Sequence, residues 1–269
     1  MNDSTPSSTT KTHKKTYSNG GAYLWGEWIR PIGEAVIIAL IVTTFLFTTV
    51  GISGTSDTPT VLNGERVFVP KYETWLHRLG IGSFQRGDLV VLKPPVGAPQ
   101  SERQVPLLGN FFPNLTYRPY FIKRIVGLPG DRIRLDRGQL YINGLKINET
   151  HTVPYWQAQK DYAGQSAWDR DSSLANTKTW PTDGWTKELQ PTTPNPTDYK
   201  VPAGHYFVMG DNRSIGGSED SRVFGPVSIA EFSGRATFVW WPPVSKGDDG
   251  KVRFRMRTLP RPTAFDTLK

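Results

Sequence analysis

The feature that most constrains this chain is an apolar run from Ile32 to Ile52, IGEAVIIALIVTTFLFTTVGI, in which Glu34 is the only charged residue. As a helix rising about 1.5 Å per residue, the run is about 30 Å long, which matches the hydrocarbon core of a bilayer. A buried core helix would show a polar face, and a cleaved signal peptide has a shorter apolar core nearer the N-terminus. We therefore expect one uncleaved transmembrane anchor over residues 31–52, after a basic and polar tail over residues 1–30.

The residues before the run indicate its orientation. Aromatic and basic side chains gather on this N-terminal side, namely Lys11, Lys14, Lys15, Tyr23, Trp25, Trp28 and Arg30. Aromatic rings favour the membrane interface, and basic residues mark the cytoplasmic side. The pattern predicts a cytoplasmic N-terminus, with residues 53–269 outside the cytoplasm. The absence of cysteine rules out disulfides and a thiol nucleophile, but it is compatible with this location.

The formal net charge of the chain is +8. Such a charge can attract nucleic acid or an anionic membrane surface. The basic residues are scattered, however, and no run of Lys and Arg is longer than two residues. We interpret the charge as a solvated face and a topology signal, and we expect no nucleic-acid partner.

Beyond the anchor, short apolar runs recur between turn residues, which is typical of β-strands. Strand patterns occur within 66–70, 86–95, 120–135, 139–147, 204–212 and 234–243. One short helix is expected near residues 73–80, and Asn143-Gly144 predicts the tip of a hairpin. The pattern is lost over residues 148–200, so we expect a loop-rich insertion at about 146–200. The fold class is mostly β.

A search for catalytic motifs finds no His-Glu-x-x-His, no phosphate-binding loop and no Gly-x-Ser-x-Gly, and the four histidines have no distinctive setting. A serine hydrolase can instead use a neutral lysine as base, because burial lowers the ordinary lysine pKa of about 10.4. Lys123 fits this requirement, since strand alternation places it on one face with Phe121 and Ile125. From this strand alone, the simpler interpretation is a lysine on an edge strand that discourages aggregation.

Three long segments, in order behind the apolar run, resemble the type I signal peptidases, which are membrane-anchored Ser/Lys endopeptidases. The matching segments are Gly54-TSDTPTVLNGERVFV, Tyr120-FIKRIVGLPGDRI and Met209-GDNRSIGGSEDSRVFGPV, with a weaker match at Arg86-GDLVV. Together they span most of residues 32–241. The resemblance implies a signal-peptidase-like β-fold catalytic domain over residues 53–269. It also implies an endopeptidase that removes N-terminal signal peptides from exported preproteins.

The resemblance also implies roles for individual residues. Ser56 corresponds to the nucleophile, Lys123 to the general base, and Ser218 to the serine that orients the lysine. The Ser56 N–H would donate to the oxyanion, and Gly54 stands where some relatives have a second donor. The residues implied to support the site from behind are Arg124, Asp211, Asp220 and Arg222. No metal or organic cofactor is expected.

Two departures from the family pattern lie near the implied site. Asp57 follows the nucleophile where the family has Met, and a carboxylate there favours the ammonium form of a nearby lysine. The loop Ser214-IGG adds two residues before Ser218. Ser214 and Ser218 are therefore alternatives for the residue that orients the lysine.

The implied partners are exported preproteins with Ala-x-Ala-like cleavage sites and the lipid bilayer of a bacterial inner membrane. Two alternatives stay open. One is a catalytically impaired, membrane-anchored paralogue, which Asp57 favours and the intact Ser56 and Lys123 oppose. The other is a Ser/Lys peptidase specialised for one class of precursor.

Overall fold

A computed structural model describes residues 20–98, 101–105, 115–136, 139–152, 198–213, 217–246 and 250–268 of the chain. The chain divides into two units, Met1–Thr44 and Phe45–Lys269. The strands fall in the larger unit, while most of the helical run before them belongs to the smaller one. The expected insertion falls largely on residues 153–197, which lie outside the described residues.

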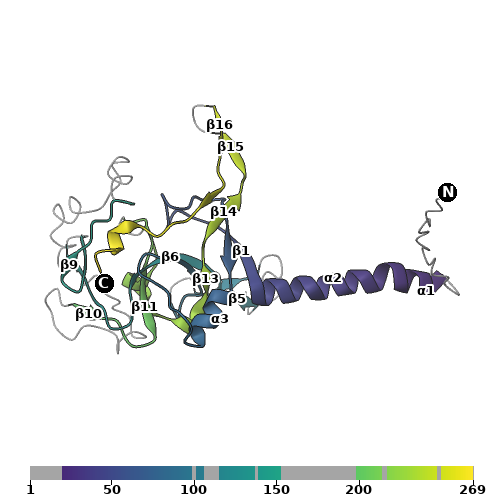
Figure 1. Cartoon of the computed structure of the whole chain (residues 1–269), viewed down its shortest axis with the longest axis horizontal. Helices are drawn as coiled ribbons and strands as arrows, with labels where there is room; N and C mark the ends of the chain where they lie inside the picture. The colour runs from purple at the N-terminus through teal and green to yellow at the C-terminus, as the bar shows by residue number, and fades with distance from the viewer. Residues whose placement is uncertain are drawn as a thin grey trace, which may run out of the picture. The chain divides into compact units, whose positions relative to one another are not determined.

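The N-terminal helical run is continuous and begins before the predicted anchor. It consists of α1 (Gly20–Leu24), the π-helical turn η1 (Trp25–Ile29), α2 (Arg30–Ile41) and the π-helical turn η2 (Val42–Leu46) (Figure 1). Within it, the 22 residues Trp25–Leu46 form a helix that is long and apolar enough to cross a membrane. Pro31 has no N–H to donate within this run, and it follows Arg30, the first residue after the π-helical turn η1.

The end of this helix differs from the expected boundary at residue 52. The helix ends at Leu46, and the next five residues form strand β1 (Phe47–Gly51), which pairs antiparallel with β2 (Arg66–Pro70). Thr48, Thr49 and Val50 are β-branched and favour extended backbone, and β2 supplies hydrogen-bond partners for it. Ser56 is therefore ten positions beyond the helix, rather than four beyond the end of an anchor at residue 52.

Three antiparallel sheets form the body of the larger unit, which confirms the mostly β fold class. The first has the order β1-β2-β14-β17, with β14 at Phe238–Trp241 and β17 at Arg257–Thr258. The second has the order β12-β11-β6-β3-β13, with bounds Val227–Ser228, His205–Met209, Phe121–Gly127, Leu89–Leu92 and Phe232–Arg235. The third has the order β10-β7-β8-β9, with bounds Tyr199–Lys200, Arg132–Asp136, Gln139–Ile142 and Leu145–Lys146.

Smaller elements complete the unit. Two strand pairs stand apart from the sheets: β4 (Arg103–Gln104) with β5 (Thr116–Tyr117), and β15 (Val244–Lys246) with β16 (Val252–Phe254). The helices are α3 (Tyr72–Arg78), α7 (Ser221–Phe224), η4 (Ile229–Glu231) and η5 (Thr263–Phe265). Asn143 and Gly144 both have positive φ, 52° and 82°, at the predicted tip of the β8–β9 hairpin.

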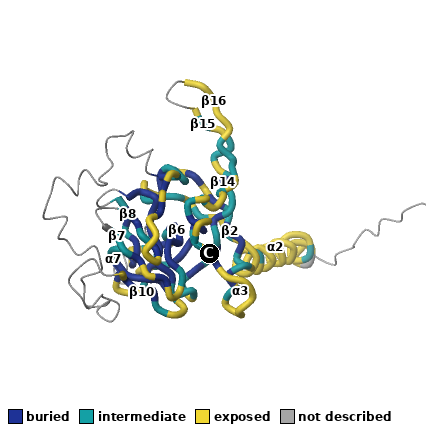
Figure 2. The backbone as a smooth tube through the Cα atoms, turned by 60° about the vertical axis from the view of Figure 1, so that its left-hand side comes forward, coloured by how far each residue is buried: buried dark blue, intermediate teal, exposed yellow. Residues whose placement is uncertain are grey.

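Strand β6 is the centre of the packing, and Figure 2 shows the buried backbone gathered around it. Its side chains enter all three hydrophobic clusters: Ile125 the first, Val126 the second and Ile122 the third. Because β6 lies between β11 and β3, Lys123 is on a central strand, and its residue is only 3% exposed. The interpretation of Lys123 as an edge-strand lysine is therefore wrong.

Candidate active site

The segment that carries Ser56 is a loop between β1 and β2 that is held closed at its base. The Ile52 N–H donates to the Glu65 carbonyl at 2.8 Å, and the Gly64 N–H donates to the Ile52 carbonyl at 3.0 Å. Arg257 donates to both carboxylate oxygens of Glu65, each at 2.8 Å. The loop thus has a fixed shape although it contains little regular structure.

Gly54 takes part in that shape through its backbone. Its φ is 103°, a conformation that residues with a side chain rarely adopt. Its N–H donates to the Asn63 side-chain oxygen at 3.1 Å. Gly54 itself therefore contributes a turn and a backbone contact, and it has no hydroxyl to act as a second oxyanion donor.

The segment after β11 holds the backbone of Ser56 in place. The Asn212 N–H donates to the Ser56 carbonyl at 2.9 Å, and the Asn212 amide donates to the Thr55 carbonyl at 3.3 Å. Gly210 lies so close that a Cβ on it would come within 3.0 Å of both the Ser56 carbonyl oxygen and the Ser218 side chain. Only a residue without a side chain fits at this point.

Lys123 reaches Ser56 from β6. Its Nζ lies 2.8 Å from Ser56 Oγ, 2.6 Å from the Ile122 carbonyl oxygen and 3.3 Å from Asp57 Oδ2. A cavity of about 270 Å³ is lined by Ser56, Lys123, Asp57 and Ser218, together with residues 50–55 and 119–122. The structure thus brings together the two residues predicted to react, at the wall of an open cavity.

Asp57 lies inside the site rather than pointing to solvent. It is 3% exposed, and its Oδ2 accepts hydrogen bonds from both Ser56 Oγ and Lys123 Nζ. Burial raises the pKa of the Asp57 carboxyl, while the charge of Lys123 acts in the opposite direction and the charge of Asp211 adds to the rise. The site therefore contains a carboxylate in contact with both candidate reacting groups.

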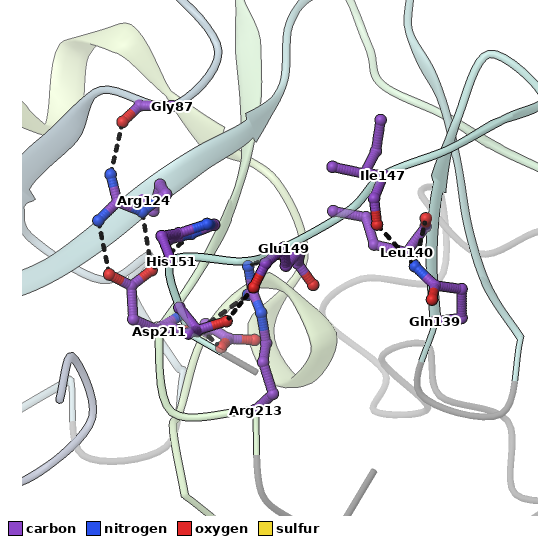
Figure 3. Close-up of polar contacts among 12 residues, drawn as sticks. Gly87, Arg124, Gln139, Leu140, Ile147, Glu149, His151, Asp211 and Arg213 are labelled. Atoms are coloured by element: carbon purple, nitrogen blue, oxygen red, sulfur yellow. Dashed lines mark hydrogen bonds and ion pairs between the residues drawn. The ribbon is translucent and has the colours of Figure 1, made fainter. Parts of the chain in front are cut away.

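Arg124 and Asp211 form a buried ion pair behind the site (Figure 3). Arg124 donates to the two Asp211 carboxylate oxygens at 2.7 and 2.5 Å and to the Gly87 carbonyl at 2.6 Å. Thr60 also donates to Asp211, and His151 Nε2 lies 3.7 Å from Asp211 Oδ1. Burial alone would raise the pKa of Asp211, but the Arg124 guanidinium holds it well below its usual range.

Asp220 and Arg222 form a second buried pair. Asp220 caps α7 by accepting from the Arg222 N–H at 3.1 Å, and it also accepts from the Arg222 guanidinium at 2.8 and 2.7 Å. Its Oδ2 accepts from the Gly210 N–H at 2.8 Å. Burial acts to raise the pKa of Asp220, but the Arg222 charge outweighs it, so that this pKa is lowered. The pair thereby holds Gly210, which lies beside the Ser56 carbonyl.

Ser218 lies in the same cavity and is 8% exposed. Its Oγ is buried and has no hydrogen-bond partner within the described part of the chain. Ser214, the alternative, lies outside the described residues. The role of either serine in orienting the lysine stays a prediction.

Several supporting residues were not singled out from the sequence. They are Thr60, Glu149, Gly210, Asn212 and Arg213; Arg213 forms a buried ion pair with Glu149 (Figure 3). The signal for most of them was present, because Gly210, Asn212 and Arg213 are part of the Met209-GDNR segment and Thr60 follows Pro59 after the nucleophile. Glu149 carries no such signal, because it lies in a polar stretch just after the strand pattern predicted at 139–147.

Comparisons with known proteins identify the family of the chain. The family model described as signal peptidase, peptidase S26, matches residues 25–241. The chain belongs to the signal peptidase family, peptidase S26. Signal peptidase I S of Bacillus subtilis is 34% identical over 217 residues, which cover 80% of this chain and 89% of that protein. Signal peptidase I of Bacillus licheniformis is 32% identical over 217 residues, covering 80% and 88%.

A crystal structure of a signal peptidase I from Enterococcus faecalis is 24% identical and covers 58% of this chain and 98% of that one. Its TM-score is 0.33, which is too low to support a structural argument. As a member of the S26 family, the chain is a peptidase, and its apolar helix Trp25–Leu46 is consistent with a membrane anchor. The family match covers both the helix and the segments that meet in the cavity.

Proposed function

We propose that the chain removes signal peptides from exported preproteins, with Ser56 as nucleophile and Lys123 as general base. The observation that carries the proposal is the 2.8 Å contact between Ser56 Oγ and Lys123 Nζ, at the wall of a cavity on the central strand. Family membership supports the same reaction class. The distance is within direct reach for proton transfer between a nucleophile and its base.

In the proposed mechanism, neutral Lys123 takes the proton of Ser56 Oγ, and the oxygen attacks the carbonyl carbon of the scissile peptide bond. The Ser56 N–H donates to the oxyanion that forms. Protonated Lys123 then gives its proton to the leaving amine as the C–N bond breaks, which leaves an acyl ester on Ser56. Water, deprotonated by Lys123, hydrolyses the ester and regenerates the hydroxyl.

The substrate is proposed to bind as an extended strand between residues 50–54 and residues 119–122. Both stretches line the cavity, and β1 is at the edge of its sheet. An edge strand can pair with an added peptide through main-chain hydrogen bonds. Small pockets beside such a strand would accept Ala-like side chains at the first and third positions before the cut.

The lipid bilayer is proposed as the surface on which the larger unit works, with the N-terminus in the cytoplasm and the peptidase unit outside. The basic residues before the helix support this orientation. Helix α3 and the turn after it expose large apolar side chains: Trp75 at 45%, Leu79 at 75% and Ile81 at 59%. The Trp75 ring lies 6.3 Å from that of Phe45, which belongs to the end of the apolar helix. Trp75 therefore contacts the first residue of the larger unit.

A catalytically impaired paralogue is the second candidate, because the Asp57 carboxylate contacts both Ser56 and Lys123. A peptidase specialised for one precursor class would share the same site.

The test is to incubate the detergent-solubilised chain with a preprotein that carries an Ala-x-Ala site. We expect cleavage by the wild type and none by Ser56→Ala or Lys123→Ala.

Two matched controls keep this test specific. Ser83 is exposed and Lys93 is half-buried, and neither lines the cavity. Ser83→Ala and Lys93→Ala should therefore cleave as the wild type does. An inactive wild type would favour the impaired paralogue, and cleavage by Ser56→Ala would disprove the proposed nucleophile.

A further inference from the structure

The unusual residue of the site is Asp57, whose side-chain hydrogen bonds go to the two groups proposed to react. Its other oxygen, Oδ1, is buried and has no hydrogen-bond partner among the described residues. A carboxylate kept for structure would be expected to satisfy both oxygens, because an unpaired buried acceptor costs free energy. The contacts of Asp57 therefore suit a role in the reaction better than a role in the fold.

We propose that Asp57 positions Lys123 and, as an anion beside it, raises the pH that the enzyme needs for activity. The inference rests on the Ser56–Lys123 dyad of the proposed function. It assigns to Asp57 the lysine-orienting contact that the family resemblance assigns to a serine, since Ser218 Oγ makes no hydrogen bond to Lys123 in this structure.

The geometry shows how the contact acts. An ammonium group has three N–H donors, and Lys123 Nζ faces three acceptors: Ser56 Oγ, the Ile122 carbonyl oxygen and Asp57 Oδ2. In this arrangement the ammonium is fully hydrogen-bonded, and the single proton of Ser56 points to Asp57 rather than to Lys123. An ammonium has no lone pair, so this state cannot start the reaction.

Loss of one proton from Lys123 changes the arrangement. The neutral amine has two N–H donors and one lone pair, and of the three groups that contact Nζ the Ser56 hydroxyl is the one that can donate to that lone pair while Asp57 is ionised. The Ser56 proton then turns from Asp57 to Nζ, which is the state required for attack. Asp57 thus competes with Lys123 for the Ser56 proton, and it stabilises the ammonium form by its charge.

The other charged side chains near Asp57 and Lys123 are largely neutralised by ion-pair partners of their own. Arg124 on β6 is paired with Asp211, and Asp220 is paired with Arg222. Asp211 and Lys123 both act on Asp57 electrostatically, and Asp220 and Lys123 interact as well. Arg103 and Glu219 line the same cavity in more exposed positions. Asp57 is the carboxylate within this set that contacts Lys123 directly.

The experiment is to measure kcat/KM from acid to alkaline pH for wild type, Asp57→Asn and Asp57→Met, with a peptide substrate that carries an Ala-x-Ala site. Asn keeps the shape without the charge, and Met is the residue that the family pattern has at this position. In the profile of kcat/KM against pH, we expect the acidic limb of Asp57→Asn and of Asp57→Met to move to lower pH by about one to three units. A shift of this size is the effect of one opposite charge in contact. Asp57→Glu should return the limb towards its wild-type position.

Glu219→Gln is the matched control, because it removes a carboxylate from a half-buried residue that lines the same cavity. The acidic limb of the Glu219→Gln profile should move far less than the limbs of the Asp57 variants. An unchanged limb in Asp57→Asn and Asp57→Met, or a shift to higher pH, would overturn the inference while leaving the dyad intact. The proposed function fails separately, if the wild type is inactive at every pH or if Ser56→Ala cleaves. Melting curves of each variant show that the profiles come from folded protein.

Discussion

Loss of the Arg124–Asp211 pair should destabilise the larger unit more than loss of any exposed pair. The two side chains are 2% and 0% exposed, and two hydrogen bonds of 2.7 and 2.5 Å join them. Asp211→Asn keeps the shape but leaves the Arg124 charge buried without its counter-ion. Breaking a buried pair in this way costs about 3–5 kcal/mol. Because about 1 kcal/mol lowers the Tm of a unit of this size by about 2–4 °C, we expect a fall of about 6–20 °C.

The assay is thermal unfolding of the full chain in detergent, followed by near-ultraviolet circular dichroism. Glu73→Gln is the control: the Arg235–Glu73 pair has a similar distance, 2.8 Å, but Arg235 is 41% exposed. With Arg235 41% and Glu73 16% exposed, the pair is partly solvated and contributes far less than a fully buried one, so this variant should melt closer to wild type than Asp211→Asn does. Replacing Arg124 and Asp211 together by Met and Leu should restore much of the loss. Equal melting temperatures for Asp211→Asn and Glu73→Gln would refute the reasoning.

The stability that the Arg124–Asp211 pair contributes should fall in acid. Arg124 holds the pKa of Asp211 below its usual range, so the ionised Asp211 contributes stability above its unfolded pKa of about 3.9. That contribution is lost as the pH falls through the lower, folded value. The difference in stability between wild type and Asp211→Asn should therefore be constant near neutral pH and narrow only in strong acid.

Three further outcomes follow from the site. Gly210→Ala should lower kcat/KM by about 100-fold, because a Cβ there displaces the Ser56 carbonyl, and the peptide assay measures it. Replacing Asp57 and Lys123 together by Met should abolish cleavage yet raise the free energy of unfolding by about 1–4 kcal/mol, measured by denaturant titration. Trp75→Ser with Leu79→Ser should slow cleavage of a preprotein in vesicles but not of a soluble peptide; equal slowing of both substrates would contradict a membrane contact.

Local patterns in the sequence predicted the strands, whereas the candidate pair Ser56 and Lys123 came from the resemblance to the type I signal peptidases. Lys123 stands in a strongly apolar strand, and such a strand is buried wherever it pairs. Its position in the sheet could not be read from that strand, because edge and central strands differ in their partners. The pairing of β6 with both β3 and β11 decided between an edge lysine and a buried one.

The end of the apolar helix Trp25–Leu46 was not predictable from hydropathy. The run stays largely apolar up to Ile52, and apolarity alone does not distinguish a helix from a buried strand. The change to strand after Leu46 depends on β2, whose five residues from Arg66 to Pro70 pair with Phe47–Gly51. This pairing depends on a strand outside the apolar run, so the composition of the run alone could not predict it.

The orientation of Asp57 in the site could not be predicted from the sequence either. Its sequence position puts a carboxylate beside the nucleophile, but its direction depends on the loop that Glu65 and Asn212 hold in place. The buried ion pairs around this loop cost free energy to form, because their charges lose their hydration. The Asp220–Arg222 pair holds Gly210, Gly210 leaves room for the Ser56 carbonyl, and Lys123 still reaches Ser56. Asp57 therefore lies in a site whose Ser56–Lys123 contact is 2.8 Å, and its carboxylate contacts both of these side chains.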